Sequence, residues 1–158
     1  MKLKKLDAIL VPRADMYSGE EVPEDEERLK YITNFSGSAG YAVISSNSSV
    51  KSVIFSDGRY ELQLKKEVDA KNFDCLNGGF KDVCLFLNAN EKKLKNIAID
   101  PWLLTLKQYE LLKGLLKGSK IKFEFVDKNL IDEIWVKKNL IVKNKIFEIS
   151  NQINGEPA

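Results

Sequence analysis

The sequence predicts an α/β domain in which a mixed β-sheet is flanked by helices. Short β-type runs alternate with helix-type runs along the whole chain, which is the pattern of a layered α/β architecture. The 158 residues suffice for one domain, which would bury about two-thirds of the surface that the unfolded chain exposes. The composition, 44% apolar and 30% charged, is that of a soluble globular protein.

The first elements are expected to be a strand over residues 8–11 and a helix that begins at Pro23. The strand is a continuous apolar run that ends at Pro12, which cannot donate a ladder hydrogen bond. Pro23 suits the first helical position, and the four acidic residues after it meet the positive end of the helix dipole. Arg28 and Lys30 each follow a glutamate by four residues, so they should form modest surface ion pairs.

A hairpin and a further helix should come next. Residues 41–44 and 53–55 are rich in β-formers and flank the turn-forming cluster SSNSS. Ser56 or Asp57 can accept the unpaired N–H groups at the start of a helix over residues 58–68, in which apolar side chains recur every four positions.

The second half of the chain repeats this alternation. Strands are expected over residues 73–76, 97–100 and 121–126, and helices over residues 81–88 and 105–118. Thr105 and Gln108 have capping-box spacing, and the stripe of Tyr109, Leu112 and Leu116 should cover the sheet. The last strand alternates phenylalanine with charged residues (KFEF), as a half-exposed strand that closes the domain should.

The composition excludes several classes of function. The 25 basic and 23 acidic residues are well mixed and give a net charge of +2, too weak a field to predict binding to nucleic acid or a membrane. The absence of histidine excludes a Ser-His or Cys-His nucleophile and removes a common ligand of zinc, manganese and iron. No spacing matches a calcium loop, so we expect neither a metal nor another cofactor in this chain.

Cysteine content and the N-terminus predict a cytoplasmic protein. Cys75 and Cys84 are too few for a disulfide framework, which fits a reduced compartment. The apolar run after the basic N-terminus is interrupted at Asp7 and ends at Pro12, too short for a secretory signal. The longest uncharged run, residues 32–50, is too polar to span a membrane.

Three polar segments are candidates for function. Residues 35–40 (FSGSAG) lack the ending of a phosphate loop, so Gly37 and Gly40 are interpreted as sites of tight backbone geometry. Arg59 could clamp a carboxylate or a peptide end, but a structural ion pair is favoured. The loop of residues 13–21 is the best candidate, because it is polar, follows a buried strand and precedes a helix.

Two strings carry a family resemblance: RLKYITNFSGSAG at residues 28–40 and FSDGRY at residues 55–60. In this order they resemble the N-terminal domain of the larger, cytosolic Xaa-Pro aminopeptidases of the creatinase, prolidase and aminopeptidase P superfamily. The resemblance extends upstream through DAILVP at residues 7–12 and downstream to NLIDEIW at residues 129–135. It therefore implies the creatinase N-terminal-domain fold for residues 1–135, with residues 136–158 as an interdomain linker and the start of a second domain.

The resemblance implies a role within a larger hydrolase, an aminopeptidase that removes the N-terminal residue from peptides with proline in second position. Two divalent metals, by the family pattern manganese, would activate water in that enzyme, with all ligands from residues beyond Ala158. This chain would then be non-catalytic and inactive alone. It would shape the substrate cleft and subunit contacts, with the enzyme's own C-terminal catalytic domain, the peptide substrate and a second subunit of a homodimer as partners.

The resemblance also indicates binding residues. Glu20 aligns with the glutamate of the family pattern D-x-H-x-S-E-Y, Asp15 with its first acid and Tyr17 with its histidine. An acid there can bind the free amino group of a peptide, so these three residues and Arg59 are the candidate substrate-binding set, while a solvated loop acid is the alternative for Glu20. A second hypothesis keeps the fold but makes the chain a stand-alone module that binds a protein or peptide.

Overall fold

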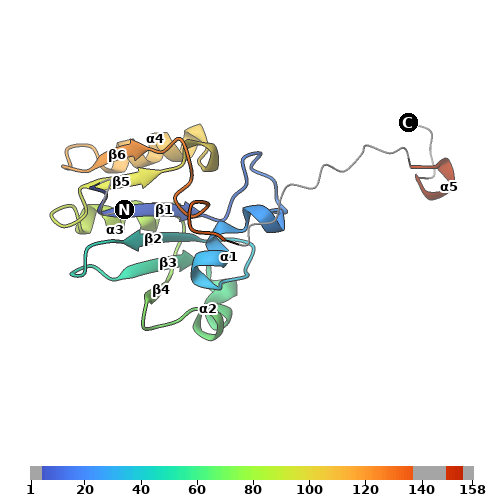
Figure 1. Ribbon diagram of the computed structural model, residues 1–158, viewed down its shortest axis with the longest axis horizontal. Helices are drawn as coiled ribbons and strands as arrows, with labels where there is room; N and C mark the ends of the chain where they lie inside the picture. Colours follow the sequence, from blue (N-terminus) through green and yellow to red (C-terminus); the bar gives the residue numbers. More distant parts are fainter. Residues whose placement is uncertain (1–4, 137–148, 155–158) are drawn as a thin grey trace.

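A computed structural model describes residues 5–136 and 149–154 of the chain, and a six-stranded sheet forms its centre (Figure 1). The strands are β1 (Ala8–Pro12), β2 (Tyr41–Ser45), β3 (Ser52–Ser56), β4 (Phe73–Asn77), β5 (Asn96–Ile99) and β6 (Lys122–Phe125). Their order across the sheet is β4-β3-β2-β1-β5-β6. Strand β2 pairs antiparallel with both of its neighbours, whereas all the other pairs are parallel, which confirms the mixed α/β sheet.

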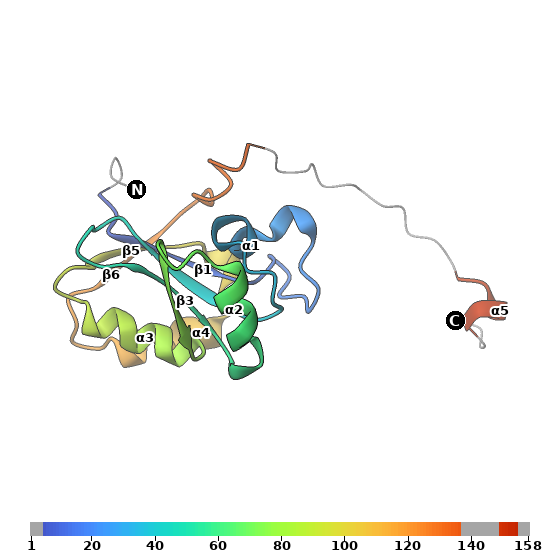
Figure 2. The ribbon, with the colours of Figure 1, turned by 90° about the horizontal axis from the view of Figure 1, so that it is seen from below.

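Helices cover both faces of the sheet (Figure 2). The α-helices are α1 (Arg28–Thr33), α2 (Glu61–Glu67), α3 (Phe80–Ala89), α4 (Leu106–Leu115) and α5 (Asn151–Asn154), and the 3-10 turns are η2 (Glu24–Glu26), η3 (Gly58–Tyr60) and η4 (Pro101–Leu103). Helices α3 and α4 pack on one face, and α1 and α2 pack on the other. The described residues contain no helix with the length and apolar character that crossing a membrane requires.

Alternation along the strands divides the core in two. In β1, Leu10 packs with residues of α3 and α4 such as Leu112, whereas Ile9 packs on the opposite face with Leu29 of α1 and Leu64 of α2. Successive strand side chains point to opposite faces, so each strand serves both layers. The sheet is buried on both sides, which explains why its central strands are almost entirely apolar.

The helix expected from Pro23 is interrupted. Turn η2 ends before Glu27, whose backbone (φ −70°, ψ 53°) is not helical, and α1 begins at Arg28. The surface pair expected between Arg28 and Glu24 is also wrong: Arg28 is buried and binds Glu26 at 3.0 Å and Asp132 at 2.9 Å. Tertiary contacts decide the geometry here, and they outweigh the local i,i+4 spacing.

The chain continues to pack after β6. Leu130 and Ile131 are buried against the face that α1 and α2 cover, and the ring of Trp135 stacks on Tyr31 at 4.6 Å. Within the described part of the chain β6 is the last strand, as predicted, but the segment that follows it also packs onto the domain. The linker and second domain expected over residues 136–158 lie largely outside the described residues.

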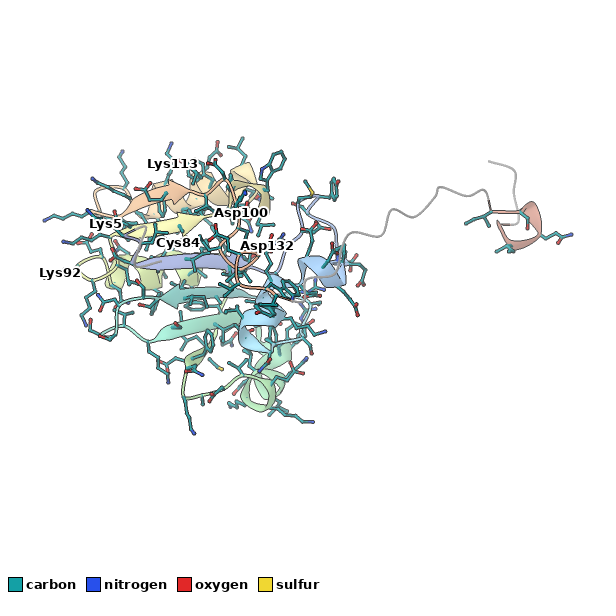
Figure 3. All side chains as sticks on the ribbon, in the orientation of Figure 1. Lys5, Cys84, Lys92, Asp100, Lys113 and Asp132 are labelled. Carbon is teal, nitrogen blue, oxygen red and sulfur yellow. The ribbon has the colours of Figure 1, made fainter. Side chains whose placement is uncertain are left out.

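The two cysteines lie on opposite faces of the sheet. Cys84, labelled in Figure 3, is buried on α3, and Cys75 on β4 packs against the core below α1 and α2. Both are free thiols.

Candidate functional site

The predicted site residues gather at one edge of the sheet. Strands β1, β3, β4, β5 and β6 run parallel to one another, so their carboxyl ends share an edge. The loop of residues 13–21 follows β1 there, and the DGRY turn of residues 57–60 follows β3. In open α/β sheets this is the edge at which ligands bind.

Arg13 organises the loop after β1. Its Nη1 donates to the carbonyl oxygens of Glu20 and Ser38, each at 3.2 Å, and its Nη2 pairs with Glu27 at 3.1 Å. Its backbone N–H donates to the carbonyl of Gly40 at 2.9 Å. Among the described residues, its Nε is the one buried polar side-chain atom that lacks a hydrogen-bond partner. Sequence reasoning missed this role, although an arginine directly after a buried strand is a detectable signal.

Asp15 and Glu20 differ in exposure within the loop. Asp15 is 4% exposed, and its Oδ1 accepts the N–H groups of Tyr17 at 3.0 Å and Gly19 at 2.8 Å. Glu20 is exposed, and its carboxylate makes no hydrogen bond or ion pair to another described residue. The ring of Tyr17 is likewise free of the core, with 82% of the residue exposed. The loop therefore turns Asp15 inward and presents Tyr17 and Glu20 outward.

The FSGSAG segment packs tightly between this loop and the DGRY turn. A Cβ on Gly37 would overlap the ring of Phe35 and lie 2.8 Å from the ring of Tyr60. These two rings meet edge to face at 5.7 Å. The hydroxyls of Ser38 and Tyr60 are hydrogen-bonded at 2.5 Å, and this bond lowers the pKa of Tyr60. Neither Gly37 nor Gly40 has a positive φ, so the tight backbone geometry expected there is not found; close approach of side chains is what limits the space at Gly37.

Arg59 takes the ion-pair arrangement that the sequence favoured. Its Nε and Nη2 donate to the two carboxylate oxygens of Asp57 at 2.9 and 2.8 Å, and the guanidinium lies 5.3 Å from the centre of the Tyr60 ring. The hydrogen bond from Arg59 lowers the pKa of Asp57, which also accepts the N–H of Arg59 as the cap of η3. Arg59 remains 73% exposed, so a ligand carboxylate could still reach it; its role in substrate binding stays a prediction.

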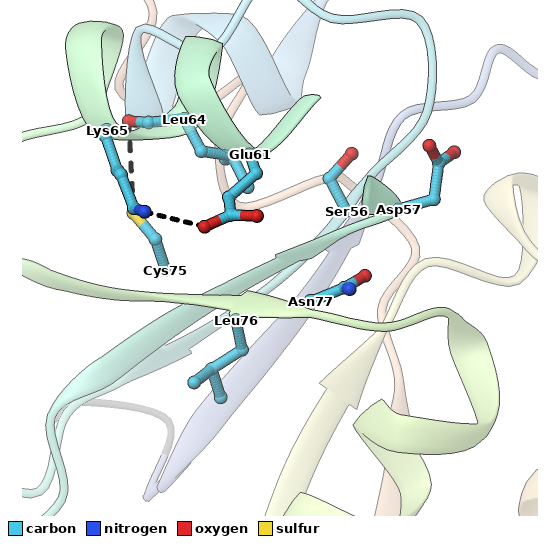
Figure 4. A pocket seen from close by; sticks show the side chains of 8 residues that line it. All are labelled: Ser56, Asp57, Glu61, Leu64, Lys65, Cys75, Leu76 and Asn77. Atoms are coloured by element: carbon cyan, nitrogen blue, oxygen red, sulfur yellow. Dashed lines mark hydrogen bonds and ion pairs between the residues drawn. The ribbon is translucent and has the colours of Figure 1, made fainter. Parts of the chain in front are cut away.

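A pocket of about 180 Å³ opens beside this turn, between α2 and the ends of β3 and β4 (Figure 4). Its lining combines an ion pair, Lys65 with Glu61 at 2.6 Å, with the thiol of Cys75, which points toward the Leu64 carbonyl at 3.9 Å. The other lining residues are Ser56, Asp57, Leu76 and Asn77. The pocket is large enough for a small side chain, and charged residues are among those that line it.

The acidic residues of the site do not form a metal centre. Within residues 5–136 and 149–154, no group of three or more histidine, cysteine, aspartate or glutamate side chains could hold an ion. The whole sequence contains no histidine. This edge of the sheet has an exposed carboxylate on a braced loop, an exposed arginine and a small pocket with both charged and apolar lining residues.

The sequence of this chain matches a known protein family and curated relatives. The family model of the creatinase/prolidase N-terminal domain matches residues 1–134. The chain is 32% identical over 160 residues to a probable Xaa-Pro aminopeptidase P of Laccaria bicolor, and 32% identical over 152 residues to one of Talaromyces marneffei. These alignments cover 99% and 94% of this chain but only 24% and 22% of the two relatives. The chain thus spans about a quarter of the length of the curated relatives it matches.

Solved structures show the same fold. The X-prolyl aminopeptidase of Caenorhabditis elegans, a cytosolic enzyme with a di-nuclear active site, superposes with a TM-score of 0.80 at 24% identity, over 96% of this chain and 25% of that one. The N-terminal domain of the cytoplasmic peptidase PepQ from Mycobacterium tuberculosis superposes with a TM-score of 0.61 at 19% identity, over 79% of this chain and 85% of that one.

Proposed function

Because the chain belongs to the creatinase/prolidase N-terminal domain family, we propose that it serves as the non-catalytic N-terminal domain of a metal-dependent Xaa-Pro aminopeptidase. Such an enzyme removes the N-terminal residue from peptides whose second residue is proline. The observation that carries the proposal is the asymmetry of the matches, which cover nearly all of this chain and about a quarter of its aminopeptidase relatives. The remaining three-quarters would contain the catalytic domain.

The metal site of the enzyme would lie outside this chain. A pair of divalent ions, which we expect to be manganese, would supply an activated water and polarise the scissile carbonyl. The described residues do not fit such a pair, because they group no three metal-binding side chains and the sequence has no histidine. We therefore assign no catalytic residue to this chain.

The part of this chain would be to shape the substrate cleft. The loop after β1 is braced by Arg13 and presents Glu20 with a carboxylate that no described residue engages. A carboxylate in that position can pair with the amino group of a peptide, a charge-assisted hydrogen bond. The same edge would face the catalytic domain, in a cytoplasmic enzyme that forms a homodimer.

An activity assay tests the non-catalytic assignment. The 158-residue chain should not hydrolyse an Xaa-Pro peptide in the presence of added manganese. Turnover that rises with protein concentration and disappears with a chelator would overturn this assignment.

The reading frame beyond codon 158 tests the enzyme itself. A continuation that encodes the aspartate, histidine and glutamate ligands of a two-metal site supports the aminopeptidase. A stop codon directly after Ala158 would instead support a stand-alone module that binds a protein or peptide through the same fold.

A further inference from the structure

Strand β6 forms an edge of the sheet whose outer side has no partner among the described residues (Figure 1). The N–H groups of Lys122 and Val126 donate to the carbonyls of Lys95 and Ile99 in the direction of β5. Because backbone groups alternate along a strand, those of Phe123 and Phe125 point away from the sheet. A row of unpaired backbone N–H and C=O groups at a sheet edge can pair with another strand.

The side chains of β6 also alternate. Ile121 and Phe123 pack on the face that α3 and α4 cover, and Phe125 contacts Tyr109 of α4 on the same side. Lys122 and Glu124 lie exposed on the opposite face, and neither forms an ion pair with another described residue. One short strand thus presents an apolar face and a face with one charge of each sign.

We propose that β6 pairs antiparallel with β6 of a second copy of this chain, about a two-fold axis at Phe123. In this register Lys122 lies opposite Glu124 of the partner subunit, and Glu124 lies opposite the partner's Lys122. On the other face, Phe123 meets the partner's Phe123. Cross-strand pairs of opposite charge and of aromatic side chains stabilise a sheet. The inference is independent of the proposed function.

Charge selects this register over its neighbours. In a two-fold antiparallel pairing, the hydrogen bonds between the two copies must come from residues whose N–H and C=O groups point away from the sheet. These are every second residue of β6, so the possible registers differ by shifts of two residues. A step in one direction would place Lys122 opposite the partner's Lys122, and a step in the other would place Glu124 opposite the partner's Glu124. Only the register at Phe123 pairs unlike charges on both sides of the axis.

The self-complementary charges identify a second copy as the occupant in place of an unrelated peptide. A lysine on an edge strand normally discourages pairing with another strand. In this register, however, Lys122 is neutralised by Glu124 of the partner subunit. The apolar face extends the contact, because Phe125 is 53% exposed and Leu106 of α4 is 71% exposed. Both residues line a cavity of about 250 Å³ beside the end of the strand. The pairing would place the partner's Ile121 opposite Phe125, where it could cover this surface.

The oligomeric state of the 158-residue chain tests the proposal. Sedimentation from micromolar to near-millimolar concentration should show a monomer–dimer equilibrium. Lys122→Glu and Glu124→Lys each replace two attractive pairs per dimer with two repulsive ones, so each should raise the dissociation constant about tenfold or more. Lys66→Glu on α2 makes the same charge change as Lys122→Glu; it is the matched control for that variant and should leave the dissociation constant unchanged.

Mixing the two variants is the decisive measurement. A chain with glutamate at both positions complements a chain with lysine at both, so Lys122→Glu and Glu124→Lys should form a heterodimer when combined. The double exchange Lys122→Glu with Glu124→Lys should also restore the homodimer. A wild-type chain that stays monomeric, or single variants that dimerise like wild type, would overturn the proposal. A mixture of the two single variants that forms no heterodimer would overturn it as well.

Discussion

Arg28 and Asp132 lie 104 positions apart in the sequence, yet the guanidinium Nε and Nη2 donate to both carboxylate oxygens of Asp132, at 2.9 and 3.0 Å. This bidentate pair fixes the segment after β6 to the start of α1. Burial alone would lower the pKa of Arg28, but the hydrogen bonds to Asp132 and Glu26 outweigh it and raise the pKa. The arginine therefore stays charged while largely buried, and it depends on its partners.

Removal of Asp132 should destabilise the domain. Asp132→Ala leaves a buried guanidinium with one carboxylate fewer, so we expect the free energy of unfolding in urea to fall by about 2–3 kcal/mol. Asp74→Ala is the control. It removes the 2.7 Å ion pair between Asp74 and Lys51, and both of these side chains are exposed. That change should cost less than about 1 kcal/mol, and equal costs for the two variants would contradict the anchoring role of Asp132.

A methyl group at Gly37 should be costly. Gly37→Ala forces the rings of Phe35 and Tyr60 apart, so the free energy of unfolding should fall by about 1–3 kcal/mol. Gly114 lies within α4, and a Cβ added there would meet no atom within 4 Å. Gly114→Ala should therefore raise stability by about 0.5–1 kcal/mol, and a loss of stability there would argue against the packing of α4.

The thiol of Cys84 should make stability depend on alkaline pH. Burial raises the pKa of Cys84 to about 11 from the ordinary 9.0, so the folded state holds this proton more tightly than the unfolded state does. The stabilisation is complete below about pH 9 and is lost as the pH rises toward about 11, at most by about 2–3 kcal/mol.

Urea titrations at about pH 8 and about pH 10 measure this dependence. Cys84→Ala creates a small cavity and lowers stability at both pH values, but it should also make the decline between them shallower. An identical decline in the variant and the wild-type chain would show that other groups cause it.

Local signals predicted much of the fold, and long-range contacts account for the rest. Both hydrogen bonds of the Thr105–Gln108 capping box are present, and Asp57 caps the helix that it precedes. These features depend on spacings of two or three residues. The burial of Arg28 depends on a carboxylate more than a hundred residues away, which no local pattern shows.

The same distinction applies to the candidate site. The pairing of Arg59 with Asp57 could be anticipated, because the two residues are neighbours in one turn. The inward orientation of the Asp15 side chain could not be anticipated from sequence. It depends on the path of a loop that Arg13 holds against residues 38 and 40. The loop of residues 13–21 could thus be selected as a candidate from sequence. Which of its acids is buried and supports the loop, Asp15, and which is exposed, Glu20, required the structure.

The proposed role of the exposed acid Glu20 can be tested in the aminopeptidase that we propose contains this domain. If Glu20 binds the amino group of the substrate, Glu20→Ala in the protein that the full reading frame encodes should raise KM for Xaa-Pro peptides about tenfold, with a smaller effect on kcat. The reason is that an ammonium–carboxylate contact made in both the ground state and the transition state contributes uniform binding. Steady-state kinetics with a short peptide that has a free amino terminus measures the effect.

Glu21 provides a matched control for this test, because it is adjacent, acidic and exposed. Glu21→Ala changes the net charge of the loop equally, so any general electrostatic attraction between the loop and a cationic peptide would fall equally in both variants. A rise in KM confined to Glu20→Ala therefore identifies a specific contact with the amino group. Equal effects of the two variants, or no change in kcat/KM for Glu20→Ala, would make Glu20 an ordinary surface residue of a loop whose role is structural.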